Sequence, residues 1–104
     1  MKKFTLPGAY AFVLVNEDMR QKERLEDYAA TSSFLQNTQL LAWEKGIGSC
    51  WKTPGFLDQP KFREALNAHA NERVIAMVQF GYFDEAPKGK ERKAVADFVS
   101  EFGA

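Results

Sequence analysis

Two short apolar runs, residues 9–15 and 73–80, constrain the fold of this chain most strongly. Both are rich in β-branched and aromatic residues and are bounded by residues typical of turns. Runs of this length and content predict β-strands that are buried on both faces. Between them, residues 20–45 contain no proline or glycine, and apolar or small side chains recur at helical spacing. This segment is therefore predicted to form one long helix.

A shorter helix is predicted after the long one. Asp58 close to Pro60 is typical of a helix start, because proline fits the first helical position. Phe62, Ala65 and Leu66 would form the inward side of this helix. We expect it to end near residues 67–71.

The last segment, residues 94–102, has apolar side chains at helical spacing and follows a polar loop at residues 84–93. The predicted order is strand, long helix, short helix, strand, polar loop and amphipathic tail. Two buried strands cannot form an independently stable sheet with covered faces and edges. We expect the missing strands to come from a second copy of the chain or from another polypeptide.

Composition indicates an ordinary globular protein and argues against several function classes. The chain has 104 residues, 45% of them hydrophobic, which suits a single domain over residues 1–104. Since 14 Lys and Arg balance 14 Asp and Glu, we expect neither nucleic acid nor an anionic membrane as a partner. No apolar run approaches the roughly 20 residues of a membrane-spanning helix. With one cysteine and no Cys/His pairs at zinc-ligand spacing, we expect no metal and a reducing, cytoplasmic location.

The glycine-rich segment 46–55 is the strongest candidate for ligand binding. We interpret it as a turn whose glycines let the backbone approach a flat ligand closely. Within it, Trp51, Lys52 and Thr53 offer a ring face, a charge and a hydroxyl. The alternative is a steric helix end, because helices commonly stop at glycine. The segment lacks the third glycine of a dinucleotide-binding fingerprint, so a Rossmann site is not predicted.

Other polar or reactive residues carry weaker signals. The basic residues within 88–93 would by default be a solvated loop. Cys50 beside a tryptophan is interpreted as a small buried hydrophobe. His69 is interpreted as a helix-end or exposed side chain. Since no triad or paired carboxylates accompany them, no catalytic residue is assigned.

The chain resembles the C-terminal half of the nitroreductase family of FMN-dependent oxidoreductases. Four segments carry the resemblance: Gly46-Ile47-Gly48-Ser49-Cys50-Trp51-Lys52-Thr53, Phe62-Arg63-Glu64-Ala65-Leu66, Val74-Ile75-Ala76-Met77-Val78-Gln79-Phe80-Gly81-Tyr82 and Lys90-Glu91-Arg92-Lys93-Ala94-Val95-Ala96-Asp97-Phe98-Val99. The resemblance implies an α+β fold with a mixed sheet flanked by helices. This fold would be incomplete in one chain and completed by dimerisation or strand exchange. It also implies a homodimer with FMN at the subunit interface, passing hydride from NAD(P)H to nitroaromatic or quinone-like acceptors.

The same resemblance assigns cofactor-binding residues. Trp51, Lys52 and Thr53 match the segment that lies along the isoalloxazine ring, and Lys90 and Arg92 match the basic residues that hold the FMN phosphate. Arg92 is the stronger of these two, since a planar guanidinium binds phosphate oxygens bidentately. Family members usually begin with an Arg-Arg-Ser-like phosphate motif, and no Arg-Arg pair occurs here. The alternative function is therefore a catalytically silent scaffold that oligomerises or pairs with a missing N-terminal half.

Overall fold

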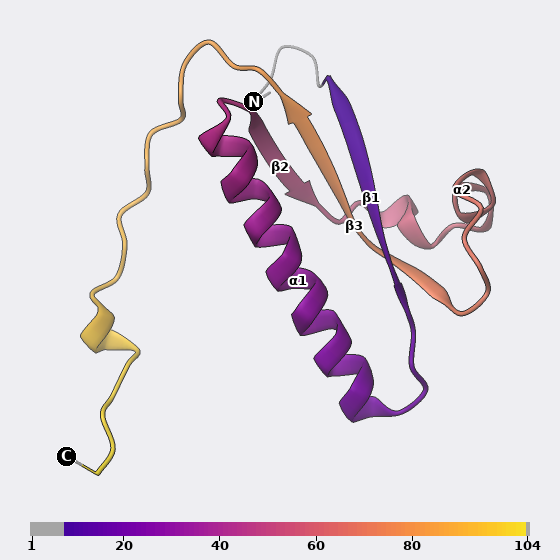
Figure 1. Ribbon diagram of the computed structural model, residues 1–104, viewed down its shortest axis with the longest axis horizontal. Helices are drawn as coiled ribbons and strands as arrows, with labels where there is room; N and C mark the ends of the chain where they lie inside the picture. The colour runs from indigo at the N-terminus through magenta and orange to yellow at the C-terminus, as the bar shows by residue number, and fades with distance from the viewer. Residues whose placement is uncertain (1–7, 104) are drawn as a thin grey trace.

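A computed structural model describes residues 8–103, which form an α+β arrangement around a small antiparallel sheet. Figure 1 shows one long helix lying along the sheet and a C-terminal segment running away from it. The elements in chain order are β1 (Ala9–Asn16), α1 (Gln21–Glu44), β2 (Gly48–Lys52), the 3₁₀ turn η1 (Gly55–Asp58), α2 (Pro60–Ala65), β3 (Glu72–Gly81) and the 3₁₀ turn η2 (Val95–Asp97). The predicted α+β class is confirmed.

The sheet has the strand order β1-β3-β2, and both pairings are antiparallel. The parallel pair of a mixed sheet does not occur among residues 8–103. β3 is the central strand and contains the fully buried residues Ala76 and Val78. In contrast, β1 packs side chains of both faces against the two apolar clusters, as predicted, but is only half buried. The physical reason is its place at the edge, where one side has no strand neighbour within the described residues.

The register of β1 and β2 against β3 aligns side chains that point to the same face of the sheet. Val13 lies opposite Ala76, whereas Leu14 lies opposite Val74, which leaves Ile75 as the extra residue of a β-bulge. On the other side, β2 runs from Gly48 to Lys52 against the end of β3. Because side chains alternate along a strand, the two faces of the sheet carry different apolar clusters.

The predicted long helix is confirmed as α1, which covers one face of the sheet. Its buried side chain Leu35 is 2% exposed and packs against Ala76 and Val78. The amide of Gln39 donates a hydrogen bond to the Ser49 hydroxyl at 3.1 Å, which joins α1 to β2. Large apolar side chains on the other sides of α1 stay exposed, namely Leu25, Phe34, Leu40, Leu41 and Trp43.

The opposite face is covered by η1 and α2. Leu57, Val74 and Met77 form its buried cluster, and Phe62 contacts it from α2. The predicted helix start at Pro60 is confirmed, and Phe62 and Leu66 point inward as expected, although Ala65 is exposed. The helix ends at Ala65, earlier than predicted, because Asn67 takes a left-handed conformation with φ of 56°.

The segment 46–55 contains a strand that the sequence analysis interpreted as part of a turn. Gly46 does turn the chain after α1, with φ of 78°. From Gly48 onward, however, the backbone pairs with β3, beginning where Gly48 and Gly81 lie opposite each other. A strand of five residues becomes stable here because a long neighbouring strand supplies its hydrogen bonds.

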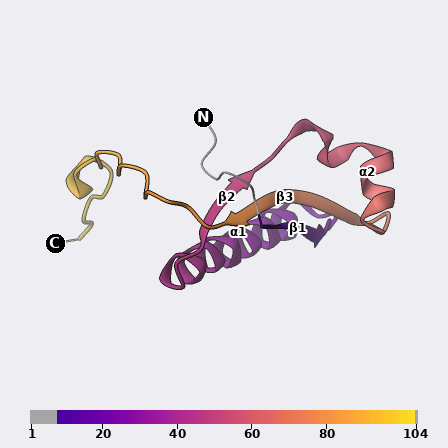
Figure 2. The ribbon, with the colours of Figure 1, turned by 90° about the horizontal axis from the view of Figure 1, so that it is seen from above.

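Residues 82–103, which we call the C-terminal arm, form no helix beyond the three-residue turn η2. The helical spacing of apolar residues at 94–102 therefore does not correspond to a helix in the structure. Figures 1 and 2 show the arm leaving the end of β3 and running away from the sheet. Its apolar side chains Val95, Phe98, Val99 and Phe102 are exposed. A short amphipathic segment gains helical stability mainly by packing, and the apolar side chains of residues 94–102 stay exposed here.

Candidate functional site

A pocket of about 480 Å³ opens where β2 ends, between α1, η1 and the start of β3. Trp51 and Thr53, two of the predicted cofactor-binding residues, line it. Tyr28 and Ser32 of α1 form one wall, and Arg73 lies at the beginning of β3. The volume is within the range of small-molecule sites, and aromatic walls with a few polar groups are typical of them.

Trp51 and Lys52 do not point to the same side of the sheet. Trp51 packs against the cluster beneath α1, which places its ring on the α1 face. Lys52 is the next residue on β2 and lies opposite Met77, which belongs to the cluster on the other face. Trp51 and Thr53 therefore line the pocket, whereas Lys52 does not.

A polar network borders the pocket, and the sequence analysis did not predict it. The Tyr28 hydroxyl donates a hydrogen bond to Glu17 Oε2 at 2.6 Å. Arg73 Nη1 donates to the same oxygen at 3.3 Å, and its Nη2 lies 3.9 Å from Asp58 Oδ2. These contacts join the chain after β1, α1, β3 and η1. They bring together residues as far as 56 positions apart, so no local pattern could have revealed them.

The network shifts the protonation equilibria of its members. Hydrogen bonds from Tyr28 and then Arg73 lower the pKa of Glu17. The same bond to Glu17 raises the pKa of Tyr28, since removing the phenol proton would place two negative charges together. Arg73 has its pKa raised, chiefly by Glu17. At neutral pH the network therefore holds an ionised carboxylate between a neutral phenol and a guanidinium.

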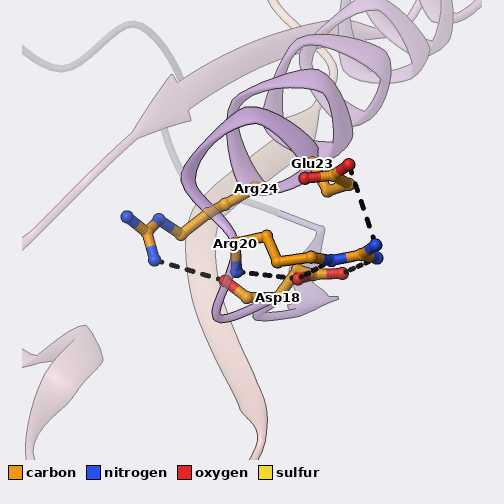
Figure 3. A network of polar contacts seen from close by, with 4 residues as sticks. All are labelled: Asp18, Arg20, Glu23 and Arg24. Atoms are coloured by element: carbon orange, nitrogen blue, oxygen red, sulfur yellow. Dashed lines mark hydrogen bonds and ion pairs between the residues drawn. The ribbon is translucent and has the colours of Figure 1, made fainter.

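A second polar network fixes the start of α1, as Figure 3 shows. Arg20 pairs with Asp18 at 2.9 Å through its guanidinium and donates its backbone N–H to the same carboxylate. These two hydrogen bonds lower the pKa of Asp18 to about 2. Arg24 Nη1 donates to the Asp18 carbonyl at 3.2 Å, and Glu23 lies 3.7 Å from the Arg20 guanidinium. This network holds the first turn of α1 in place and does not line the pocket.

Lys90 and Arg92, the predicted phosphate-binding residues, lie on the exposed C-terminal arm. The arm runs away from the sheet in both views of the ribbon, so one chain does not bring these residues to Trp51 and Thr53 (Figures 1 and 2). Within the part of the chain that the structure describes, the hydrogen bonds between backbone groups of residues 82–103 are local to η2. The predicted site is therefore split into a ring part on the body and a phosphate part on the arm.

The structure gives no catalytic or metal-binding role to Cys50 or His69. Cys50 is half buried on β2, and His69 is exposed between α2 and β3. Over residues 8–103, no three side chains of the His, Cys, Asp and Glu type gather as metal ligands. Within the same residues, no helix is long and apolar enough to cross a membrane.

Comparisons with known proteins point to one family. The model of the nitroreductase family matches residues 2–82. The Bacillus subtilis (strain 168) protein named "Putative NAD(P)H nitroreductase YfhC" is 45% identical over 96 residues, which is 92% of this chain and 49% of that protein. The nitroreductase-like family protein from Bacillus cereus has a TM-score of 0.82 at 42% identity, covering 91% of this chain and 51% of that one.

A more distant structure shares the fold. A variant of the FMN and NADPH-dependent nitroreductase NfnB from Sphigopyxis sp. strain HMH has a TM-score of 0.73 at 18% identity. The match covers 90% of this chain and 43% of that one. The chain thus spans about half the length of the relatives that it matches.

Proposed function

The chain belongs to the nitroreductase family, and on that premise we propose that it forms part of an FMN-dependent oxidoreductase. This enzyme passes hydride from NAD(P)H through FMN to small acceptors of the nitroaromatic or quinone type. The observation that carries the proposal is the 45% identity to the Bacillus subtilis relative over nearly the whole chain. The cofactor supplies the hydride chemistry, so the protein's part is to bind, orient and exclude water.

The pocket beside β2 fits the ring of such a cofactor. Trp51 lines it with an aromatic ring and Thr53 with a hydroxyl-bearing side chain, and Gly55 adds no side chain to the lining. In this proposal the segment from Trp51 to Thr53 lies along the isoalloxazine, with Lys52 contributing its backbone. Tyr28 and Arg73 add polar groups at the opposite wall. An open pocket with both apolar and polar lining residues suits a flat, heteroatom-rich ring.

A second copy of the chain completes the site in this proposal. Lys90 and Arg92 bind the FMN phosphate, with Arg92 as the bidentate partner. Since the arm carries both away from the pocket of their own chain, they serve the pocket of the partner in a homodimer. The exposed apolar residues of α1 and of the arm supply apolar surface for this association. We place the homodimer in the cytoplasm, in keeping with its single cysteine.

A flavin titration followed by a turnover assay tests the proposed function. FMN fluorescence is measured as purified protein is added, and saturable quenching is expected. The loaded protein should then oxidise NADH or NADPH when a nitroaromatic or a quinone is present. Quenching without turnover would limit the chain to cofactor binding, and a lack of quenching would reject the proposal.

The second candidate is a scaffold that pairs with a separate polypeptide similar to the other half of the relatives. It is favoured by the 49% coverage of the Bacillus subtilis relative and by the two strand edges that have no neighbour within residues 8–103. Light scattering and a binding assay with the N-terminal half of that relative separate the candidates. FMN binding that appears only after this half is added would favour the scaffold.

A further inference from the structure

A stacked pair of aromatic rings connects the C-terminal arm to the body. Trp43 in the last turn of α1 lies parallel to Phe83, with ring centroids 5.2 Å apart and an interplanar angle of 2°. Phe83 comes two residues after the end of β3 and is half buried. Trp43 would otherwise be a solvent-exposed apolar side chain, because 54% of it remains accessible even in this pair.

The stack stands at the point where the arm changes direction. The backbone of β3 is held by β2 up to the pair of Gly48 and Gly81. Beyond it, the chain passes the C-terminal end of α1 and then leaves the body, as Figures 1 and 2 both show. In the described chain the backbone hydrogen bonds within η2 do not attach the arm to the sheet. The ring pair is thus a contact that holds the start of the arm against the end of α1.

We propose that Trp43 and Phe83 are positioning residues for the flavin phosphate, because their stack directs Lys90 and Arg92 of the arm toward the partner's pocket. This inference rests on the proposed function. Arg92 follows Phe83 by nine residues, which span at most about 30 Å when fully extended. Over such a length, a fixed starting direction limits the volume that the guanidinium samples and so raises its effective concentration at the phosphate.

The size of the effect is bounded by the strength of the stack. Freeing Phe83 lengthens the tether only back to Gly81, so chain length alone changes little. Without the stack the arm loses its fixed starting direction. This loss can weaken FMN binding by no more than the free energy that the stacked pair itself contributes. Offset or stacked aromatic pairs correspond to a factor of about 2 to 12 in an equilibrium constant. We therefore expect FMN binding to weaken by about 2- to 12-fold without the stack.

Comparison of FMN with riboflavin isolates the phosphate. Dissociation constants for both are measured by flavin fluorescence on the wild type, Phe83→Leu, Phe83→Tyr and Tyr82→Leu. Phe83→Leu should weaken FMN binding by about 2- to 12-fold and leave the dissociation constant of riboflavin unchanged. Phe83→Tyr should keep the stack, so its dissociation constant for FMN should equal that of the wild type. Tyr82→Leu is the matched control, since it removes a 78% exposed aromatic next to Phe83 and leaves the stack with Trp43 in place.

Arg92→Ala in both backgrounds completes the test. Arg92→Ala should weaken FMN binding by more than about tenfold in the wild-type background. It should weaken binding by less in the Phe83→Leu background, because the Arg92 guanidinium is already misdirected in that variant. Equal losses of FMN and riboflavin in Phe83→Leu, or an unchanged FMN constant, would overturn the inference while leaving the phosphate role intact. An Arg92→Ala variant that binds FMN like the wild type would instead overturn the phosphate role, and this inference with it.

Discussion

Truncation of Leu35 to alanine tests how α1 is held on the sheet. Leu35 is 2% exposed and lies between α1 and the central strand, against Ala76 and Val78. The substitution removes apolar contacts and leaves a cavity, at a cost of about 2–5 kcal/mol. Ala76 is too small to fill the space and is held in β3, so little relaxation is expected. We expect a loss near 3 kcal/mol, a large part of the roughly 5–15 kcal/mol of a typical domain.

Leu40→Ala is the matched control, because it makes the same chemical change in the same helix. Leu40 is 58% exposed in one chain, so its truncation should cost about 1 kcal/mol or less at a protein concentration at which light scattering shows a monomer. Both variants are unfolded in urea at one protein concentration, with tryptophan fluorescence as the signal, since association would alter the apparent stability. Equal losses for the two variants would refute the packing described here and would mean that α1 buries another face.

Three further predictions concern single residues. Gly46→Ala should lower stability by about 1–2 kcal/mol in urea unfolding, because its φ of 78° disfavours a Cβ even though the space is open, whereas Gly89→Ala should be near neutral. The pKa of Asp18 is depressed, so its stabilising contribution is present above its ordinary value of 3.8 and is lost as pH falls toward about 2. The melting-temperature difference between wild type and Asp18→Asn should shrink over that interval. Tyr28→Phe removes the hydrogen bond to Glu17, so the pKa of Glu17 should rise toward its ordinary value in an NMR titration, and no change would contradict the bond.

The main elements could be predicted from sequence where the signal is local. The runs at 9–15 and 73–80 and the segment 20–45 free of proline and glycine correspond to β1, β3 and α1. β2 was missed because its five residues start at a glycine and depend on pairing with β3. The amphipathic spacing of residues 94–102 is typical of a helix, but spacing alone does not supply a surface to pack against.

Some residues of the candidate site also carry a local sequence signal, whereas others come together only through tertiary packing. Trp51 and Thr53 stand out in a glycine-rich segment, and they do line one pocket. Tyr28 and Arg73 carry no local signal, since they meet through Glu17 only after three elements have packed. The direction of Lys52 depends on strand register, which the turn interpretation could not provide. The roles of Lys90 and Arg92 stay predictions, because the arm does not reach the pocket of its own chain.

The central claim is a flavin site built from two copies of the chain, and mixing two defective variants tests it most directly. Trp51→Leu impairs the ring part and keeps an apolar side chain under α1, while Arg92→Ala impairs the phosphate part. Each variant alone should bind FMN weakly. After subunit exchange, half of the dimers would be mixed, and each mixed dimer would hold one intact site.

FMN is titrated against each variant and against the mixture. The account predicts that tight binding returns at roughly a quarter of the sites in the mixture, as statistical exchange in a twofold dimer requires. A mixture that binds no better than its two components would contradict it, because the ring and phosphate parts would then belong to one chain.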